Sequence, residues 1–407
     1  MKIRSITYFC NPGWPLDESK IEQAGKFLAE AKADFAAAGY EVQTTRLATV
    51  PFVQILGAGK ISQTPRLAER MSALIQSAGI AFAALGPALP DAPDSYAVIP
   101  EAIAATQNIF FSGVMADAQS GISIPAVQAC AEVITRCASI SPDGFANLRF
   151  AALANVGPGS PFFPAAYHSH DEPAFSIATE AADLAVKVFT NARTISDGQR
   201  ELTCEIEKHA GELARVGDEL SRRSSIAFGG IDFSLAPFPS EAVSIGAAFE
   251  RMGVPRAGLH GSLAAAAILT EIIERARFPR TGFGGLLLPV LEDAILARSA
   301  AEGTLTIKDL LLYSAVCGTG LDTLPLPGDT TADQIAALLL DLAALALRLN
   351  KSLTARLMPI PGKKAGDPTN FNFDYFANSR VMALEAQALK PPLSEESRIR
   401  LTSRRSD

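Results

Sequence analysis

The chain lacks both long apolar runs and a high density of charge. Of its 407 residues, 48% are hydrophobic and only 19% are charged, whereas intrinsic disorder needs low hydrophobicity and high charge. A membrane span needs about 20 consecutive apolar residues. The most apolar stretches, Ile335–Leu349 and Gly285–Leu291, are interrupted by Asp341 and Arg348 or are too short. The sequence therefore predicts a folded globular protein without a membrane span.

An excess of basic residues is also missing. The net charge is −7, and Lys and Arg cluster only at Arg398–Arg405, in a polar tail that we expect to fray. Proteins bind nucleic acid through Lys and Arg contacts with phosphate groups. We therefore do not expect nucleic acid or membranes as partners. We expect a small-molecule ligand instead.

The chain has few cysteines, and their spacing does not suggest disulfide pairs. The five cysteines are odd in number, and no two of them form a CxxC motif. This indicates reduced thiols, not a disulfide framework or a zinc knuckle. The start of the chain, Met1–Ile6, has no basic and apolar leader. We therefore expect a cytoplasmic protein.

Three common active-site motifs are absent. A phosphate loop requires GxxxxGK[ST], but in the nearest match Ile61 follows Lys60. Gly229-Gly230 is not part of a GxGxxG dinucleotide fingerprint and lacks the downstream acid that binds a ribose. GxSxG, the nucleophile elbow of α/β-hydrolases, is missing as well.

Short apolar runs alternate with helical segments along the chain. We expect strands over Ile3–Phe9, Glu41–Val50, Ile80–Leu85, Ile109–Val114, Arg149–Val156, Ile226–Phe233, Gly285–Leu288 and Ala355–Ile360, with Tyr313–Val316 as a shorter run. We expect helices over 17–38, Thr64–Ala78, Pro100–Gln107, Pro125–Ala138, Phe175–Glu219, Ser240–Arg251, Leu263–Arg277 and Ala332–Leu349, and one beginning at Pro289. This alternation is typical of parallel strands with crossover helices. Since no linker stands out, residues 1–407 are predicted to form one α/β domain, with a short polar tail over about 390–407.

The first polar loop at a strand end runs from Asn155 to Glu172. Its glycines permit close approach of a ligand to the backbone, and His168 can transfer protons near neutral pH. A loop histidine bonded to the backbone is the alternative. The run His170-Asp171-Glu172 lacks the spacing of a zinc site, so a solvated loop tip is the better interpretation.

Two further loops carry carboxylates. Asp232 lies within an apolar run, where a charge is costly unless it is paired or binds a ligand. A turn-forming or helix-capping aspartate is the alternative. Glu292 and Asp293 lie one turn after Pro289, where the helix dipole alone favours acidic residues.

The fourth loop, Cys317–Asp329, combines a thiol with glycines and acids. Cys317 lies beside Gly318 and Gly320 and five residues before Asp322. An accessible thiol in this position would act as a nucleophile or redox group, given a partner base. Alternatively, Cys317 is a small buried hydrophobic residue, and Asp329 caps the next helix.

Together these loops resemble a prokaryotic family of unknown function. The resemblance is carried by RFAALANV (149–156), PFFPAAYH (161–168), FSIATEAADL (175–184), IDFSLAP (231–237), LLLPVLED (286–293), AVCGTGLDTLPLPGD (315–329) and MPIPGKKAGD (358–367). It implies the ten-stranded α/β barrel of ribonucleotide reductase and pyruvate formate-lyase, with helices outside and two five-stranded parallel halves that run antiparallel. A cysteine-bearing loop lies inside such barrels. Glycyl-radical enzymes carry an RVxG signature, but this chain has Ala383 in place of the glycine, so no glycyl radical is expected.

The sequence thus predicts an enzyme with an internal pocket near Cys317. Its predicted catalytic residues are Cys317, His168 and Asp322. Its predicted ligand-binding residues are Asn155, Glu180, Asp232, Gly318, Gly320 and Asp329. A divalent metal ion with oxygen ligands is the cofactor we consider, with Asp232, Glu292 and Asp322 as candidates. The alternative is a non-catalytic small-molecule or metal-binding sensor on the same fold, and a homo-oligomer is expected in either case.

Overall fold

The computed structural model describes residues 1–57 and 59–404. Its strands are β1 (Lys2–Cys10), β2 (Val42–Thr49), β3 (Phe82–Ala88), β4 (Ile109–Asp117), β5 (Gly121–Ser123), β6 (Phe150–Ala154), β7 (Ala174–Glu180), β8 (Ala227–Asp232), β9 (Gly320–Pro327), β10 (Leu353–Ile360) and β11 (Arg398–Ile399). Its helices are α1 (Glu18–Ala37), α2 (Phe52–Leu56), α3 (Thr64–Ser77), α4 (Asp94–Ala97), α5 (Ile99–Ala104), α6 (Ile124–Ala138), α7 (Ala182–Asn191), α8 (Ile195–Ser224), α9 (Ile245–Arg251), α10 (Ser262–Arg275), α11 (Ala294–Ala301), α12 (Ile307–Tyr313) and α13 (Ala332–Leu349). Short 3-10 helices span Ile61–Gln63, Phe145–Arg149 and Glu241–Val243.

The strands form one large mixed sheet with the order β8-β7-β1-β2-β3-β4-β6-β10-β9. Strands β1, β2, β3, β4 and β6 are parallel neighbours. At one end β7 pairs antiparallel with β1, and at the other β10 pairs antiparallel with β6. Strands β8 and β9 then continue in parallel with β7 and β10. The sheet therefore contains a central parallel set of five strands, flanked at each end by a parallel pair that runs in the opposite direction, a mixed α/β architecture as predicted.

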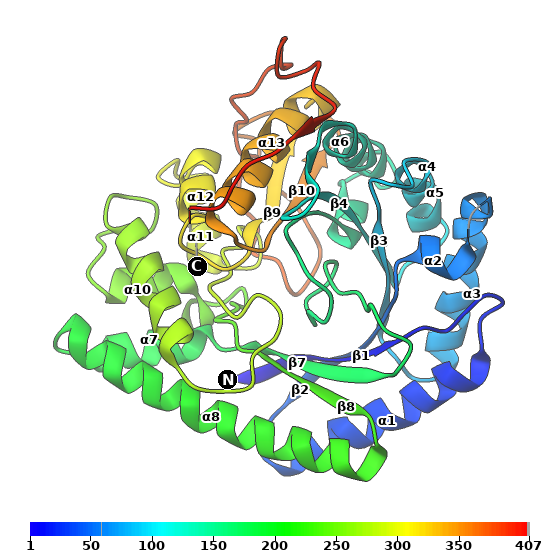
Figure 1. Ribbon diagram of the computed structural model, residues 1–407. Helices are drawn as coiled ribbons and strands as arrows, with labels where there is room; N and C mark the ends of the chain where they lie inside the picture. Colours follow the sequence, from blue (N-terminus) through cyan, green and yellow to red (C-terminus); the bar gives the residue numbers. More distant parts are fainter. Residues whose placement is uncertain (58, 405–407) are drawn as a thin grey trace.

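The two ends of this sheet order are joined through an irregular segment. A β-bridge links Leu235, just after β8, to Leu286, and another links Pro289 to Asp322 of β9. The sheet curves strongly, the helices lie on its outer side, and two long loops run inside the curve (Figure 1). These loops cover roughly residues 155–173 and 361–381. Both halves of the chain thus contribute to one interior.

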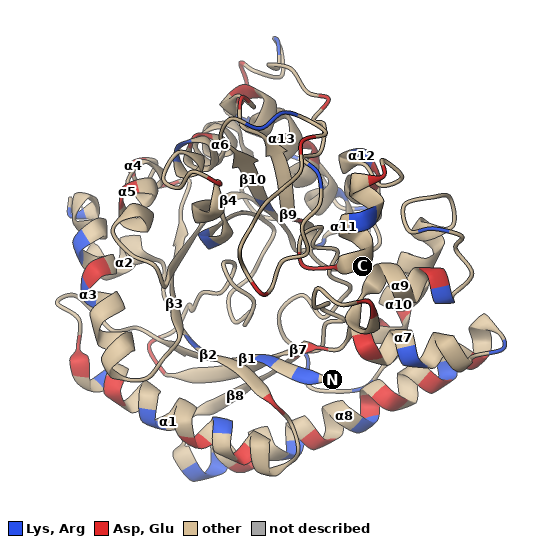
Figure 2. Cartoon of the chain, turned by 180° about the vertical axis from the view of Figure 1, so that it is seen from behind, with Lys and Arg blue, Asp and Glu red and all other residues tan. Residues whose placement is uncertain are grey.

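Amphipathic helices cover the sheet. In α8, Leu202, Ile206 and Leu213 recur at helical spacing and are fully buried, as a core-facing stripe requires. Acidic and basic residues are interspersed along α1 and α8 (Figure 2). Thr331 and Gln334 form a capping box that begins α13. The main hydrophobic cluster lies between these helices and the strands.

Two predicted elements were wrong. The expected helix over Phe175–Glu219 begins instead with strand β7, because residues 174–180 pair with strands on both sides. The expected loop Cys317–Asp329 contains strand β9, which pairs with β10 over most of its length. Pro325 and Pro327 do not disrupt β9, since a proline is tolerated where a strand needs to donate to one side only.

Smaller differences occur around α11 and α12. Tyr313 ends α12, so the apolar run that follows it is not a strand. Pro289 lies in a β-bridge, and the next helix begins only after Asp293, whose side chain accepts hydrogen bonds from two helix amides. Gly285–Leu288 contributes a bridge and no regular strand. Proline has no backbone N–H to donate to a neighbouring strand, and glycine weakens a strand, so a regular strand does not form at these positions.

The C-terminal segment returns across the molecule. Strand β11 pairs with β5, and Ile124 donates to the carbonyl of Ser397. The predicted tail over 390–407 is thus anchored at β11, while residues 405–407 lie outside the described part. Within the part of the chain that the structure describes, no helix combines the length and apolar character needed to cross a membrane.

Candidate functional site

A cavity of about 320 Å³ lies on the inner side of the curved sheet. Several aromatic rings line its wall, among them Phe82, Phe110, Phe162, Phe163, Phe283 and Phe373. Phe110 packs edge-on against Phe163 with ring centroids 5.3 Å apart. Cavities of this size, mostly apolar with a few polar groups, are typical of small-molecule sites.

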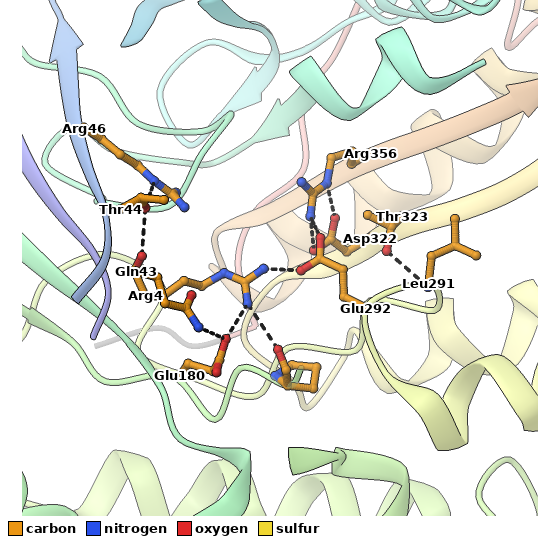
Figure 3. Close-up of polar contacts among 11 residues, drawn as sticks. Arg4, Gln43, Thr44, Arg46, Glu180, Leu291, Glu292, Asp322, Thr323 and Arg356 are labelled. Carbon is orange, nitrogen blue, oxygen red and sulfur yellow. Dashed lines mark hydrogen bonds and ion pairs between the residues drawn. The ribbon is translucent and has the colours of Figure 1, made fainter. Parts of the chain in front are cut away.

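A buried carboxylate joins the central parallel set of strands to the pair β10–β9 at this cavity. Glu292 accepts a hydrogen bond from Arg4 of β1 with one oxygen and from Arg356 of β10 with the other, the latter at 2.6 Å. Arg356 also donates from Nε to Asp322 of β9 at 2.6 Å and from Nη2 at 3.0 Å. The four side chains form one continuous ion-pair chain along the cavity wall (Figure 3).

Glu180 extends this ion-pair chain beyond the cavity wall. Its Oε2 lies 3.6 Å from Nη1 of Arg4 and accepts a 2.8 Å hydrogen bond from Gln43. Arg4 also donates to the carbonyl of Pro237. The guanidinium of Arg4 is thereby fixed between two carboxylates that come from different loops and strands.

Two further arginines line the cavity without a carboxylate partner in the described residues. Arg46 of β2 donates to Oγ1 of Thr44 at 2.9 Å, and its guanidinium stacks 5.0 Å from the ring centre of Phe163. In Figure 3 the Arg46 side chain points toward the Arg4–Glu292–Arg356 group. Arg149 is buried and donates to the carbonyl of Thr106 at 2.6 Å. A guanidinium keeps its charge at neutral pH, so these two side chains are charged and have no hydrogen-bonded carboxylate partner among the described residues, while the charge of Glu292 acts on Arg46 from a distance.

The pKa values of the cavity carboxylates move in opposite directions. Burial alone would raise the pKa of Glu292, but Arg4 and Arg356 outweigh it and hold that pKa below its usual value. The pKa of Asp322 is raised. Burial and the negative charge of Glu292 raise it, and together they outweigh Arg356, which lowers it. Burial also raises the pKa of Glu180. Two carboxyl groups whose environments move their pKa values apart are typical of acid–base sites.

The structure brings three of the predicted residues together. Asp322, Glu292 and Glu180, which lie far apart in the sequence, all belong to the ion-pair chain at the cavity. Gly318 contacts Gly285 backbone to backbone, and Thr319 lines the cavity. The wall of the cavity thus comes within two residues of Cys317 in the sequence, at Thr319.

The other two predicted catalytic residues do not line this cavity. Cys317 is fully buried and belongs to the main hydrophobic cluster. His168 is buried too, and its Nε2 lies 2.8 Å from the carbonyl oxygen of Glu172. Burial lowers the pKa of His168. Their catalytic roles stay predictions, and neither is in contact with the carboxylates of the ion-pair chain.

Asp232 holds a loop that shapes the cavity. Its carboxylate accepts backbone hydrogen bonds from Phe283 at 2.7 Å and Gly284 at 2.8 Å, and one from the Ser234 hydroxyl at 2.6 Å. Burial raises its pKa to about 6 despite these bonds. A Cβ atom on Gly282 would lie 2.0 Å from the carboxylate. Asp232 thus positions Phe283, which lines the cavity.

We expect Asp232→Asn to lower the free energy of unfolding by about 2 kcal/mol, because the amide group places a donor against backbone donors in a buried site. Urea denaturation at pH 7 measures the change. Asp218→Asn, on the exposed surface of α8, is the control and should change stability by less than about 0.5 kcal/mol. Equal stability of both variants would show that the loop does not depend on the Asp232 carboxylate.

The other predicted ligand-binding residues lie elsewhere. Asn155 has a left-handed backbone (φ 56°) and donates to Asn350 at the end of α13. Gly320 has φ +98°, and a Cβ atom there would lie 2.4 Å from the carbonyl oxygen of Thr354. Asp329 is exposed. None of the three lines the cavity.

The predicted metal ligands are not gathered into one cluster. Asp232 is bonded to backbone amides, whereas Glu292 and Asp322 are bridged by Arg356. In residues 1–57 and 59–404, no group of three or more His, Cys, Asp or Glu side chains is placed to hold a metal ion.

Sequence analysis missed the arginines of the site. Arg4 and Arg356 each interrupt an apolar strand, LTARLMPI in the case of Arg356. A charge in a buried strand requires a partner or a ligand, and this requirement, which singled out Asp232, holds equally for Arg4 and Arg356. Phe373 and Tyr375, which also line the cavity, lie in a segment without a readable sequence pattern.

Comparisons with known proteins agree with the predicted resemblance. The family model described as Uncharacterised ACR (DUF711) matches residues 1–377. A UPF0210 protein of Pyrobaculum islandicum is 33% identical over 348 residues, which are 81% of this chain and 76% of the relative. A UPF0210 protein of Neisseria gonorrhoeae is 30% identical over 370 residues, 87% of this chain and 82% of the relative. A third, of Acetivibrio thermocellus, is 35% identical over 286 residues, 68% of this chain and 63% of the relative. The chain therefore belongs to the uncharacterised prokaryotic family DUF711.

Proposed function

We propose that the sheet closes into a ten-stranded α/β barrel, as in pyruvate formate-lyase and ribonucleotide reductase, with the cavity inside. The bridges from Leu286 to Leu235 and from Pro289 to Asp322 support this, because they make residues 285–289 the tenth strand position between β8 and β9. The opposite direction of the two end pairs relative to the central parallel set supports it as well. The whole chain then forms a single domain.

Within this barrel, the cavity binds a small organic anion. The observation that carries this proposal is Arg46, a cation without a carboxylate partner that stacks on Phe163 in a cavity lined by several aromatic rings. Arg46 is partly buried, and an anionic ligand in the cavity would replace the water that solvates its charge with a charge-assisted hydrogen bond. Arg149, on the same cavity, adds a second such cation.

The protein acts on this anion as an enzyme by acid–base chemistry. Asp322 and Glu292 lie on the cavity wall with pKa values shifted in opposite directions. Arg4 and Arg356 favour the ionised form of Glu292, whereas burial makes Asp322 the more basic of the two carboxylates. A carboxyl group with a raised pKa beside a bound substrate is suited to donate or accept a proton.

The second candidate is a non-catalytic sensor that binds the same ligand. The burial of Cys317 in the hydrophobic cluster favours it, since thiol chemistry would need an accessible sulfur atom. Native mass spectrometry of the purified protein would identify a co-purified ligand. Conversion of that ligand on incubation supports the enzyme, and its unchanged recovery supports the sensor.

We also propose a cytoplasmic protein that assembles as a homo-oligomer. The unbridged cysteines Cys10, Cys130, Cys137, Cys204 and Cys317 support a reducing compartment. Light scattering of the purified protein measures the oligomeric state, and a monomer at all concentrations would contradict this part of the proposal.

Arg46→Met should weaken anion binding at least tenfold, because it removes the unpaired cation and keeps the apolar stem. Isothermal titration with benzoate, 4-carbamoylbenzoate, terephthalate and inorganic phosphate measures the effect. The matched control is Arg66→Met on the exposed side of α3, which should bind as the unchanged protein does. The proposal fails if none of the four anions binds, or if Arg46→Met binds them all equally well.

A further inference from the structure

The charged side chains around the cavity are unequal in number. Those on its wall, or in contact with it, are Arg4, Arg46, Arg149, Arg356, Glu180, Glu292 and Asp322. The charge of Lys2 also acts on Glu180, but Lys2 is paired with Glu41, so these two residues together add no net charge. Four guanidinium groups therefore face three carboxylates, and one positive charge is left in excess.

We infer that the ligand is a monoanion, an organic monocarboxylate with a flat apolar body, and not a dicarboxylate or a phosphate ester. The inference rests on the proposed function and narrows its substrate class. One carboxylate neutralises the excess charge beside Arg46. A second negative charge would be buried without a partner, which is costly in an apolar cavity. A phosphate ester carries about 1.5 to 2 negative charges at neutral pH and meets the same penalty.

On one side the cavity adjoins a hollow of the surface, which we take as its opening, and the wall there offers hydrogen bonds and no counter-charge. Gln43, Thr44 and Gln107 line both the cavity and an adjoining hollow on the surface. All three are neutral. Lys32, which belongs to the hollow, is exposed to solvent, where the attraction of a charge is screened. The opening thus accommodates a neutral polar group of the ligand and not a second acid.

The aromatic wall determines the shape of the ligand body. Phe110 and Phe163 meet edge to face, and so do Phe162 and Phe283, at centroid distances of 5.3 Å and 6.4 Å. Aromatic side chains in such pairs present ring faces and edges to a flat partner at ring-stacking distances. A planar or aromatic monocarboxylate fits these surfaces better than an extended polar chain does.

An isosteric pair of probes isolates the charge. 4-Carbamoylbenzoate and terephthalate have nearly the same shape, but the first is a monoanion with a neutral amide and the second is a dianion. Isothermal titration of the full chain at pH 7.5 should show at least tenfold tighter binding of 4-carbamoylbenzoate. Equal or tighter binding of terephthalate or inorganic phosphate would overturn the inference. If terephthalate or phosphate bound and Arg46→Met abolished this binding, the proposed anion site would still stand. Failure of the monoanion inference can therefore be distinguished from failure of the proposed function.

Changing the charge balance provides a second test. Glu180→Gln keeps the side-chain shape beside Arg4 and Gln43 and raises the excess to two positive charges. The preference for 4-carbamoylbenzoate over terephthalate should then narrow at least threefold. Glu219→Gln, on the exposed surface of α8, is the matched control and should keep the original ratio. An unchanged ratio in a folded Glu180→Gln protein contradicts the inference, and if this variant does not fold, the comparison of probes on the unchanged protein decides alone.

Discussion

Glu292→Gln should lower the free energy of unfolding by about 3–5 kcal/mol, the usual result of removing one partner from a buried ion pair. Glu292 is 4% exposed, and each of its oxygens accepts from a different arginine. An amide can accept with one atom only, so either Arg4 or Arg356 faces a donor after the exchange. Urea denaturation at pH 7, followed by circular dichroism, measures the loss.

Acidification gives an independent check of the same substitution. Because the pKa of Glu292 is held below its ordinary 4.5, its ionised form contributes stability that is present above pH 4.5 and is lost as the pH falls further. The difference between the two proteins should therefore shrink at pH 3.5. Glu219→Gln, at an exposed pair with Arg215, should change stability by less than about 1 kcal/mol at either pH. A similar loss in both variants would show that Glu292 is no more important than a surface acid.

The alternation of strands and helices was predictable because buried parallel strands are apolar throughout. Apolar runs such as Ile3–Phe9 and Ala355–Ile360 can be recognised as strands without knowing which strands lie beside them. Strands β7 and β9 were not predictable in this way. Residues 174–180 contain Ala and Glu, which favour helices, and residues 320–327 contain two prolines. Both become strands only because a neighbouring strand is already in place, which is information that a local pattern does not contain.

The acids of the site were easier to predict than its cations. Asp322, Glu292 and Glu180 lie at or near the ends of apolar segments, where loops carry functional groups. Arg4, Arg46 and Arg356 lie inside strands, and their convergence depends on how the sheet curves. Cys317 shows the opposite error. Its glycine-rich setting suggested an accessible thiol, but those glycines allow two backbone segments to meet.

That backbone contact leads to the last prediction, that Gly318→Ala lowers the free energy of unfolding by about 3 kcal/mol. A Cβ atom on Gly318 would lie 2.7 Å from Cα of Gly285, and one on Gly285 would lie 2.6 Å from Cα of Gly318. Backbone cannot swing aside as a flexible side chain does, so the added methyl group must separate the two segments. Chemical denaturation measures the loss.

A second glycine provides the control for Gly318→Ala. Gly211 lies within α8 with open space around its Cα, so Gly211→Ala should stabilise the protein by about 0.5–1 kcal/mol through helix propensity alone. The two substitutions add the same methyl group and should act in opposite directions. Residues 285–289 provide the bridges that connect Leu235 after β8 to Asp322 of β9. If Gly318→Ala proves as harmless as Gly211→Ala, these segments do not touch, and the proposed closure of the barrel at this point is wrong.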